Sequence, residues 1–323
     1  MKDCVTWSLI ASALVTSFLV GGVAFAGKGS PPGRGIAPIV STGWLEENAG
    51  MKSLVVLDIR SEAAYGEGHI PGARSAPFEM PVSAWTVVRD GLLLEVPEKD
   101  QLFDTLGSLG ITTDSKVVIV TSPVPGQPPY YGLADATRVA DTLIYAGVKD
   151  VAVLDGGHPK WSAEERPTTR DVPDWDSASF QGEVRTEMIV STGYVHEQLC
   201  KAKLIDARDA DVYFGVTLEP FADKPGHIPT ASSLPAPWIW DANEDGTYTY
   251  KSRKTLEAMA SSLTGGCKDA GCRELIVYCG VGGYASAWWF LLTQVLGYEN
   301  VKLYDGAAQA WVREHDMVPF QWD

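Results

Sequence analysis

Short apolar runs recur along the chain, and longer stretches that mix apolar and polar residues separate them. We interpret six of these runs as buried strands: residues 54–57, 117–120, 151–154, 204–205, 275–278 and 301–304. Helices are predicted between the runs, and two begin near Ser41 and Ser191, whose hydroxyl groups can cap a first turn. Buried strands that alternate with helices indicate an α/β fold with mainly parallel sheets, in which ligands gather at the carboxyl ends of the strands.

The pattern occurs twice. Residues 39–44 (IVSTGW) return as residues 189–194 (IVSTGY), and residues 147–161 match residues 297–311, both at an offset of 150. Residues 68–73 (GHIPGA) match 226–231 (GHIPTA) at an offset of 158, so the second copy carries about ten additional residues around 216–225. A period of this length is the size of a domain. The predicted organisation is one domain over residues 38–165, a linker over 166–185 and a second domain over 186–323.

The first 26 residues form a separate segment. Lys2 precedes an almost wholly apolar stretch over residues 7–25, and residues 24–26 (AFA) have the small-x-small pattern of a cleavage site. We interpret residues 1–26 as a cleavable signal peptide, with an uncleaved membrane anchor as the alternative. Residues 27–37 are then a flexible mature start, and the protein is expected in the periplasm or secreted, without stable membrane insertion.

The charge balance excludes one class of partner. The chain has 41 acidic and 26 basic side chains, a net charge of -15, and no basic run. Nucleic acid binding depends on the release of counterions to Lys and Arg, so we expect no nucleic acid partner.

The most informative motif follows the predicted strand 275–278. Cys279 opens a loop whose glycines let backbone N–H groups turn inward, and a helix predicted from near Ala285 adds its positive end. Such a loop is expected to stabilise an anion on sulfur, lower the thiol pKa and activate the nucleophile. The alternative is an inert cysteine buried at a strand-to-helix turn. The candidate cradle residues are Gly280, Val281, Gly282, Gly283, Tyr284 and Ala285.

Together these residues resemble the rhodanese (sulfurtransferase) superfamily. The resemblance is carried by Asp58-x-Arg60, Tyr65 and residues 68–73, and by Asp206-x-Arg208, Tyr213 and residues 226–229 in the second copy. It implies two tandem rhodanese-like domains, each a mainly parallel sheet flanked by helices, of which only the second is catalytic. In the first copy Thr121 stands opposite Cys279, and prolines replace the glycines.

The resemblance also implies the chemistry. Cys279 would take sulfur from a small donor, become a persulfide and pass the sulfur to a thiol or cyanide acceptor, with no metal or other cofactor. A periplasmic dithiol protein is a candidate acceptor. Asp206 and Arg208 are candidates for orienting the loop, and an internal ion pair is the other interpretation of these two residues. A catalytically silent exported scaffold, or a protein that binds sulfur or selenium species, is the alternative function.

The donor is not fixed by this resemblance. Thiosulfate-type enzymes have basic residues where Gly280 and Val281 stand, so the loop is nearer to the 3-mercaptopyruvate type. That type has an arginine where this chain has Val212. Lys224, Arg253 and Lys254 are candidates for the missing positive charge.

Four cysteines remain after removal of the predicted signal peptide, and export makes a disulfide plausible. We predict one bridge that excludes Cys279. Cys267 can close a short loop with Cys272, or Cys200 can pair with Cys272 if their strands are neighbours, as the family sheet implies.

Overall fold

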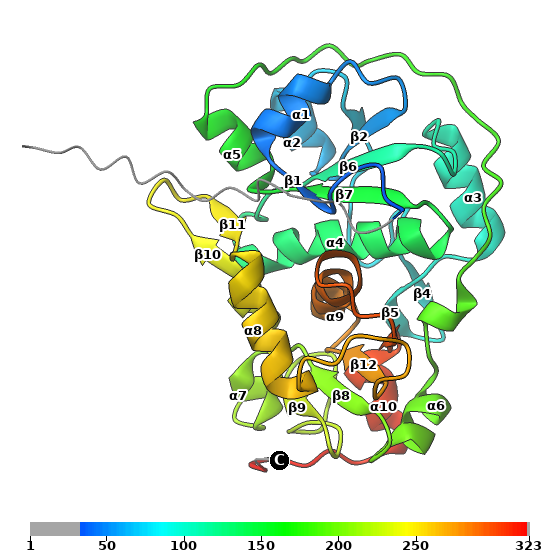
Figure 1. The fold of residues 1–323 in the computed structure, drawn as a ribbon, viewed down its shortest axis with the longest axis vertical. Coiled ribbons are helices and arrows are strands. Elements are labelled where there is room, and N and C mark those ends of the chain that lie inside the picture. Colours follow the sequence, from blue (N-terminus) through cyan, green and yellow to red (C-terminus); the bar gives the residue numbers. More distant parts are fainter. Residues whose placement is uncertain (1–32, 322–323) are drawn as a thin grey trace, which may run out of the picture.

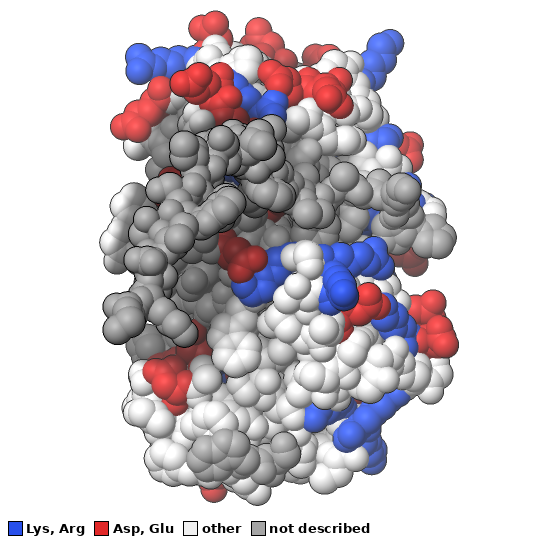
Figure 2. Space-filling model, turned by 60° about the vertical axis from the view of Figure 1, so that its left-hand side comes forward, with Lys and Arg blue, Asp and Glu red and all other residues white. Residues whose placement is uncertain are grey.

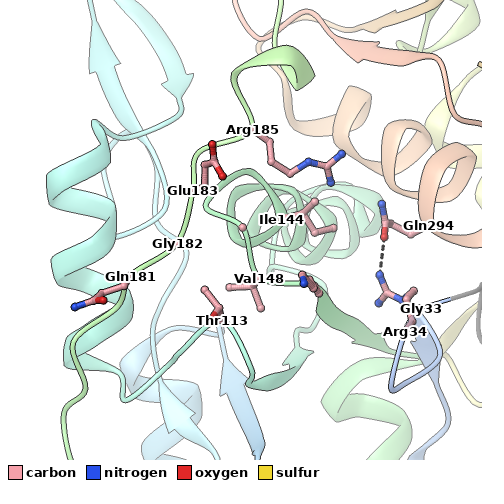
Figure 3. A pocket seen from close by; sticks show the side chains of 12 residues that line it. Gly33, Arg34, Thr113, Ile144, Val148, Gln181, Gly182, Glu183, Arg185 and Gln294 are labelled. Carbon is pink, nitrogen blue, oxygen red and sulfur yellow. Dashed lines mark hydrogen bonds between the residues drawn. The ribbon is translucent and has the colours of Figure 1, made fainter.

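The computed structural model describes residues 33–321, so the predicted signal peptide over residues 1–26 lies outside the described residues. Within residues 33–321 there is no helix with the length and apolar character needed to span a membrane. Of the segment predicted to be flexible, the structure describes residues 33–37. There Ile36 is buried, and Arg34 donates a hydrogen bond to the Val151 carbonyl at 2.5 Å. Arg34 also donates to Gln294 Oε1 at 2.5 Å (Figure 3).

Domain one is built on a parallel sheet of five strands in the order β1-β7-β6-β2-β3. The strands are β1 (Ile39–Val40), β2 (Leu54–Asp58), β3 (Arg74–Ser75), β6 (Lys116–Val120) and β7 (Asp150–Leu154). Its helices are α1 (Thr42–Asn48), α2 (Glu62–Glu67), α3 (Lys99–Ser108), α4 (Pro129–Tyr145) and α5 (Gly157–Ala163). In Figure 1 the helices α1, α2 and α5 lie above this sheet and α4 lies below it.

Domain two repeats this plan with a parallel sheet in the order β13-β12-β8-β9. The strands are β8 (Lys203–Asp206), β9 (Ser232–Ser233), β12 (Leu275–Tyr278) and β13 (Val301–Leu303). Its helical segments are η1 (Thr186–Met188), α6 (Thr192–Gln198), α7 (Ala210–Tyr213), η2 (Ala236–Ile239), α8 (Arg253–Thr264), α9 (Gly283–Phe290) with its π-helical continuation η3 (Leu291–Val295), and α10 (Ala307–Glu314). The predicted fold class, two tandem α/β domains with parallel sheets flanked by helices, is confirmed.

Local sequence explains several of these elements. The Ser41 hydroxyl accepts a hydrogen bond from the Trp44 N–H at 3.1 Å, and the Ser191 hydroxyl accepts one from the Tyr194 N–H at 3.3 Å, as the predicted caps require. Successive strand residues point to opposite faces of a sheet, and both faces of β6 are covered. Ile119 accordingly packs in the cluster that contains α4, whereas Val118 packs in the outer cluster beneath α1 and α5.

The two domains share one core. Helices α4 and α9 lie between the two sheets (Figure 1). A continuous apolar cluster runs from Ile119 of β6 through both helices to Val277 of β12. The Thr137 and Ser286 hydroxyls, one from each helix, are 3.1 Å apart. The relative position of the domains is therefore fixed by a buried apolar core that both domains share.

Each domain also sends a hairpin onto the other. In domain one, β4 (Val87–Arg89) and β5 (Leu92–Glu95) form a hairpin whose Leu93 exchanges two hydrogen bonds with Gln309 of α10, at 2.9 and 2.8 Å. In domain two, the hairpin of β10 (Trp240–Ala242) and β11 (Tyr248–Tyr250) donates from the Tyr250 N–H to Asp155 at 2.9 Å. These reciprocal contacts close both sides of the interface.

The predicted linker, residues 166–185, follows the surface of domain one in an extended conformation (Figure 1). Trp175 Nε1 donates to the Ser108 carbonyl at 3.0 Å, and the Ala178 N–H donates to the Gly107 carbonyl at 2.8 Å. These contacts attach the segment along α3.

One disulfide forms among the described residues, between Cys267 and Cys272. The prediction of one bridge that excludes Cys279 is confirmed. Of the two pairings left open, the Cys200–Cys272 bridge is wrong, and the Cys200 thiol is free and exposed. The short loop between β12 and α8 brings Cys267 to Cys272 directly, so no neighbouring strand is needed.

An ion pair between the domains is fully buried. Arg138 Nη1 of α4 lies 2.5 Å from Asp305 Oδ1, just beyond β13, and their side chains are 0% and 4% exposed. Arg138 also donates to the Leu94 carbonyl, and the Val96 N–H donates to Asp305 Oδ2 at 3.0 Å. The pair connects α4, the β4–β5 hairpin and domain two.

Replacing Arg138 with Ala leaves the Asp305 carboxylate buried without its partner, so we expect a loss of about 3–5 kcal/mol in the free energy of unfolding. Arg185→Ala is the matched control, because Arg185 forms an exposed pair with Glu187 and its loss is expected to cost less than about 1 kcal/mol. Urea unfolding measures both values. Equal losses for the two variants would contradict a structural role for the buried pair.

Candidate functional site

A cavity of about 870 Å³ lies between the domains. It opens beyond the carboxyl ends of β2 and β6 in domain one and of β12 in domain two, the edge at which parallel sheets gather their ligands. Domain one contributes Arg60, Phe78, Glu79, Thr121, Tyr131 and Asp135 among other residues. Domain two contributes Glu219, Phe221, Cys279, Gly280, Val281, Gly283 and Tyr284. Both halves of the duplicated chain are therefore needed to form this site.

Cys279 follows β12 directly and lies on the wall of the cavity, with 3% of its surface exposed. Its Sγ accepts a hydrogen bond from the Gly282 N–H at 3.1 Å, and the Val281 and Ala285 N–H groups also act on the sulfur. Helix α9 begins at Gly283, two residues before the predicted start. The structure thus brings together the predicted loop of Gly280, Val281, Gly282, Gly283, Tyr284 and Ala285 around the predicted nucleophile.

Gly282 explains why this loop needs glycine. Its φ is +95°, in the left-handed region that favours glycine. A Cβ at this position would lie 3.2 Å from Asp305 Oδ1 and 3.3 Å from Arg138 Nη1. The buried ion pair between the domains therefore supports the loop from behind, and a Cβ here would crowd it, in addition to the strain of the left-handed backbone.

The protonation of the thiol differs from the expectation. Burial raises the pKa of Cys279 to about 11, and the negative charge of Glu219 adds to the rise. The N–H groups of Ala285, Val281 and Gly282 lower the pKa, but by less than burial raises it. The prediction that the loop leaves the resting thiol with a low pKa is wrong, because the closed interface removes water from the sulfur.

Asp206 and Arg208 form an internal ion pair behind the loop. Arg208 Nη2 lies 2.7 Å from Asp206 Oδ2 and also donates to the Gly226 carbonyl at 2.7 Å. Asp206 in turn accepts a hydrogen bond from the Tyr278 hydroxyl at 2.7 Å. Since Tyr278 directly precedes Cys279, the pair holds the end of β12 in place, and neither of its residues lines the cavity.

The first copy contains the same ion pair without the cysteine. Arg60 Nη2 lies 2.6 Å from Asp58 Oδ2 and donates to the Gly68 carbonyl at 2.9 Å. Thr121, at the position of Cys279, donates its hydroxyl to the Gly132 carbonyl at 2.7 Å. The pair is therefore a structural feature of both domains, and at this position only the second domain has a cysteine.

Sequence reasoning missed the three carboxyl groups of the cavity, those of Glu79, Asp135 and Glu219. Glu219 lies in the ten additional residues of the second copy, and a Cβ on Gly280 would be 2.8 Å from its Oε2. The repeat locates the additional residues in the sequence, but it does not predict that they fold back against the loop after Cys279. Asp135 lies on α4, where an isolated acidic residue carries no sequence signal, and burial raises its pKa to about 8.

Tyr284 of the loop stacks on Tyr131 of α4, with ring centroids 5.2 Å apart and an angle of 30° between the rings. The aromatic pair joins the two domains beside Cys279, and burial, followed by the negative charge of Asp209, raises the pKa of both phenols.

The expected replacement cations are not at the site. Lys224 donates to the His315 carbonyl at 2.9 Å and pairs with Asp316 at 3.0 Å. Arg253 and Lys254 begin α8, and none of these three side chains lines the cavity. The prediction that they supply positive charge to a donor is wrong, because Lys224 is held by His315 and Asp316, and Arg253 and Lys254 lie outside the cavity lining.

A second hollow, of about 670 Å³, lies near the carboxyl end of α4. Arg34, Arg185 and Gln294 line it, and Figure 3 shows Arg34 bonded to Gln294. The residues described around this hollow include no cysteine.

Acidic side chains are numerous on the end of the molecule that domain one forms (Figure 2). Within residues 33–321, no group of His, Cys, Asp and Glu side chains is placed to hold a metal ion.

Comparisons with known proteins point to one family. The family profile described as rhodanese-like domain matches residues 41–164 and 191–314. The sulfur carrier protein TtuD of Thermus thermophilus is 32% identical over an alignment of 288 residues, and the match covers 84% of this chain and 93% of the relative. A relative from Mycolicibacterium smegmatis, provisionally named a thiosulfate sulfurtransferase, is 30% identical over an alignment of 298 residues. The match covers 87% of this chain and 95% of the relative. Among solved structures, SseA from Escherichia coli, described as a 3-mercaptopyruvate sulfotransferase, matches with a TM-score of 0.65 and 23% identity. The match covers 84% of this chain and 99% of the SseA chain.

The raised pKa of Cys279 predicts its alkylation behaviour. Iodoacetamide reacts with thiolate, so the rate at Cys279 should rise about tenfold per pH unit from pH 7 to about pH 10, without a plateau. Glu219→Gln removes a neighbouring negative charge and should make Cys279 react faster at pH 8. Peptide mapping by mass spectrometry separates this site from the exposed Cys200.

The control is Glu257→Gln, which removes an equal charge from the exposed surface of α8 and should leave the Cys279 rate unchanged. A plateau near pH 7, or equal effects of both variants, would contradict the account of the thiol.

Proposed function

This chain belongs to the rhodanese family, and from that membership we propose that it is a sulfurtransferase. It moves sulfane sulfur from a small donor to a thiol or cyanide acceptor through a persulfide on Cys279. The observation that carries the proposal is the ring of N–H groups around Cys279 Sγ, on the wall of a cavity that both domains enclose. Relatives named for sulfur transfer or sulfur carriage, at 30% and 32% identity, support the same chemistry.

The first half-reaction loads the cysteine. Cys279 loses its proton, and the thiolate attacks the outer sulfur of the donor; a bond forms between the two sulfurs, and the bond from the outer sulfur to the rest of the donor breaks. The electron pair leaves with the donor remnant, which is sulfite in the case of thiosulfate. Because the pKa of the resting thiol is about 11, loading is expected to become faster as the pH rises.

The second half-reaction transfers the outer sulfur from Cys279 to the acceptor. The acceptor thiolate attacks the outer sulfur of the persulfide, and the electron pair of the broken sulfur–sulfur bond returns to Cys279. A persulfide is a stronger acid than a thiol, so the loaded cysteine ionises at a lower pH than the resting one. The N–H groups of Val281, Gly282 and Ala285 are the donors available to its anion.

Donor preference follows from the lining of the cavity. Gly280 and Val281 are neutral, and the guanidinium of Arg60 is already paired with Asp58. A doubly charged thiosulfate ion therefore meets no unpaired cation among the described lining residues. We propose that thiosulfate is a weaker donor than 3-mercaptopyruvate or a persulfide.

We also propose that the protein acts in the periplasm or outside the cell, with a dithiol protein among its candidate acceptors. The proposal rests on the residues 1–26 alone. A mature protein that begins at Gly27 would support it, and one that keeps residues 1–26 would contradict it.

One observation favours the alternative of a silent scaffold: the resting thiol is buried and protonated at neutral pH. Mass spectrometry of the intact protein decides between the two functions. After separate incubation with thiosulfate, 3-mercaptopyruvate and glutathione persulfide at pH 8.5 or above, we expect a gain of one sulfur atom from at least one donor.

The gain should disappear in Cys279→Ser and persist in Cys200→Ser, which removes the exposed free thiol as a matched control. No gain with any donor, or a gain that follows Cys200, would leave the scaffold as the function.

A further inference from the structure

The cavity beside Cys279 has more carboxyl groups than cationic groups in its lining. Its described lining contains three carboxyl groups and one guanidinium, those of Glu79, Asp135, Glu219 and Arg60. The Arg60 guanidinium is committed to Asp58, at 2.9 Å from Nε and 2.6 Å from Nη2. Its positive charge is therefore cancelled before any substrate arrives.

Glu219 brings negative charge closest to the reacting sulfur. Its carboxylate touches Gly280, the residue after Cys279, and its charge raises the pKa of the Cys279 thiol. Its cationic neighbour, Arg208 Nη1 at 3.4 Å, is already paired with Asp206. An anionic substrate is repelled here, and a cation is attracted.

Asp135 is a carboxyl group without a partner. It lines the cavity from α4 and makes no hydrogen bond or ion pair with any residue between 33 and 321. Burial alone raises its pKa to about 8. A positive charge beside it would restore the ionised form, so binding of a cation is coupled to the release of a proton.

An aromatic surface completes the site. The stacked rings of Tyr131 and Tyr284 lie beside the sulfur, and Phe78 and Phe221 provide further apolar walls. Aromatic faces attract ammonium groups, and they do so most strongly where water is excluded. Carboxylates and aromatic rings around one cavity are a combination suited to an organic cation.

We infer that the acceptor of sulfur from Cys279 is a small organic thiol that carries a positive charge, held between Asp135, Glu219 and the Tyr131–Tyr284 pair. The inference rests on the proposed function, because an acceptor exists only if Cys279 carries sulfur. Loading strengthens the preference, since the persulfide adds a negative charge to the cavity. In the transfer, the acceptor sulfur bonds to the outer sulfur, and the electron pair of the broken bond stays on Cys279.

The test compares three thiols of equal length that differ in charge: thiocholine (positive), 2-mercaptoethanol (neutral) and 2-mercaptoethanesulfonate (negative). Persulfidated protein, freed of donor, is mixed with each thiol, and quenched samples are weighed to follow the loss of sulfur. Each rate is divided by the rate of the same thiol with glutathione persulfide in solution, which removes differences in intrinsic reactivity. We expect the corrected rate for thiocholine to exceed that for 2-mercaptoethanesulfonate by about tenfold or more at low salt.

Charge-neutral variants test the residues. Glu219→Gln and Asp135→Asn should each reduce the thiocholine preference by about threefold or more, whereas Glu257→Gln, on the exposed surface of α8, should preserve it. Asp135 has no described partner to lose, so Asp135→Asn is expected to fold normally, and thermal unfolding checks this.

Binding without sulfur transfer gives an independent measurement. Calorimetry of the unloaded protein should show that choline binds more tightly than its uncharged analogue 3,3-dimethylbutan-1-ol. Choline binding should also release a proton, and the Asp135→Asn variant should not show this release. Equal corrected rates for the three thiols, or equal binding of the two alcohols, would overturn the inference and leave the proposed function intact. Failure of every donor to load Cys279 would instead overturn the proposed function, and this inference with it.

Discussion

The hydrogen bonds from loop N–H groups to the sulfur of Cys279 are the interaction on which the site depends. They exist because β12 delivers the cysteine to the start of α9, and because glycine at position 282 lets the backbone turn around the sulfur. The loop is supported on both sides: the Asp206–Arg208 pair holds Tyr278 before it, and the Arg138–Asp305 pair lies behind Gly282. Two buried ion pairs therefore position one thiol.

The first copy of the duplicated domain both supports the loop after Cys279 and forms one wall of the cavity. Domain one contains the ion pair of Asp58 and Arg60 but has Thr121 at the position of Cys279. Its helix α4 contributes Arg138 to the support, and Tyr131 and Asp135 to the cavity. Domain two has an additional segment that places Glu219 against the loop after Cys279. The same enclosure that forms the cavity also removes water from the thiol, which explains why Cys279 rests protonated although amide dipoles point at it.

Much of this fold could be predicted from the sequence, because its determinants are local or repeated. Residues close together in the sequence determine the apolar strands, the helix caps at Ser41 and Ser191, and the glycine loop after Cys279. The parts that could not be predicted depend on contacts between distant segments. Asp135 and Glu219 meet the cysteine only once the domains close, and the closure also decides the pKa of the thiol. For the disulfide, two partners of Cys272 were compatible with the spacing, and the folded loop selects Cys267.

The most direct test of the central claim is a crystal structure of the protein after loading with sulfur. The account predicts one additional sulfur atom bonded to Cys279 Sγ, inside the cavity between the domains and within hydrogen-bond distance of the N–H groups of residues 281–285. An additional sulfur on Cys200 instead, or one on Cys279 that points away from these N–H groups, would contradict it.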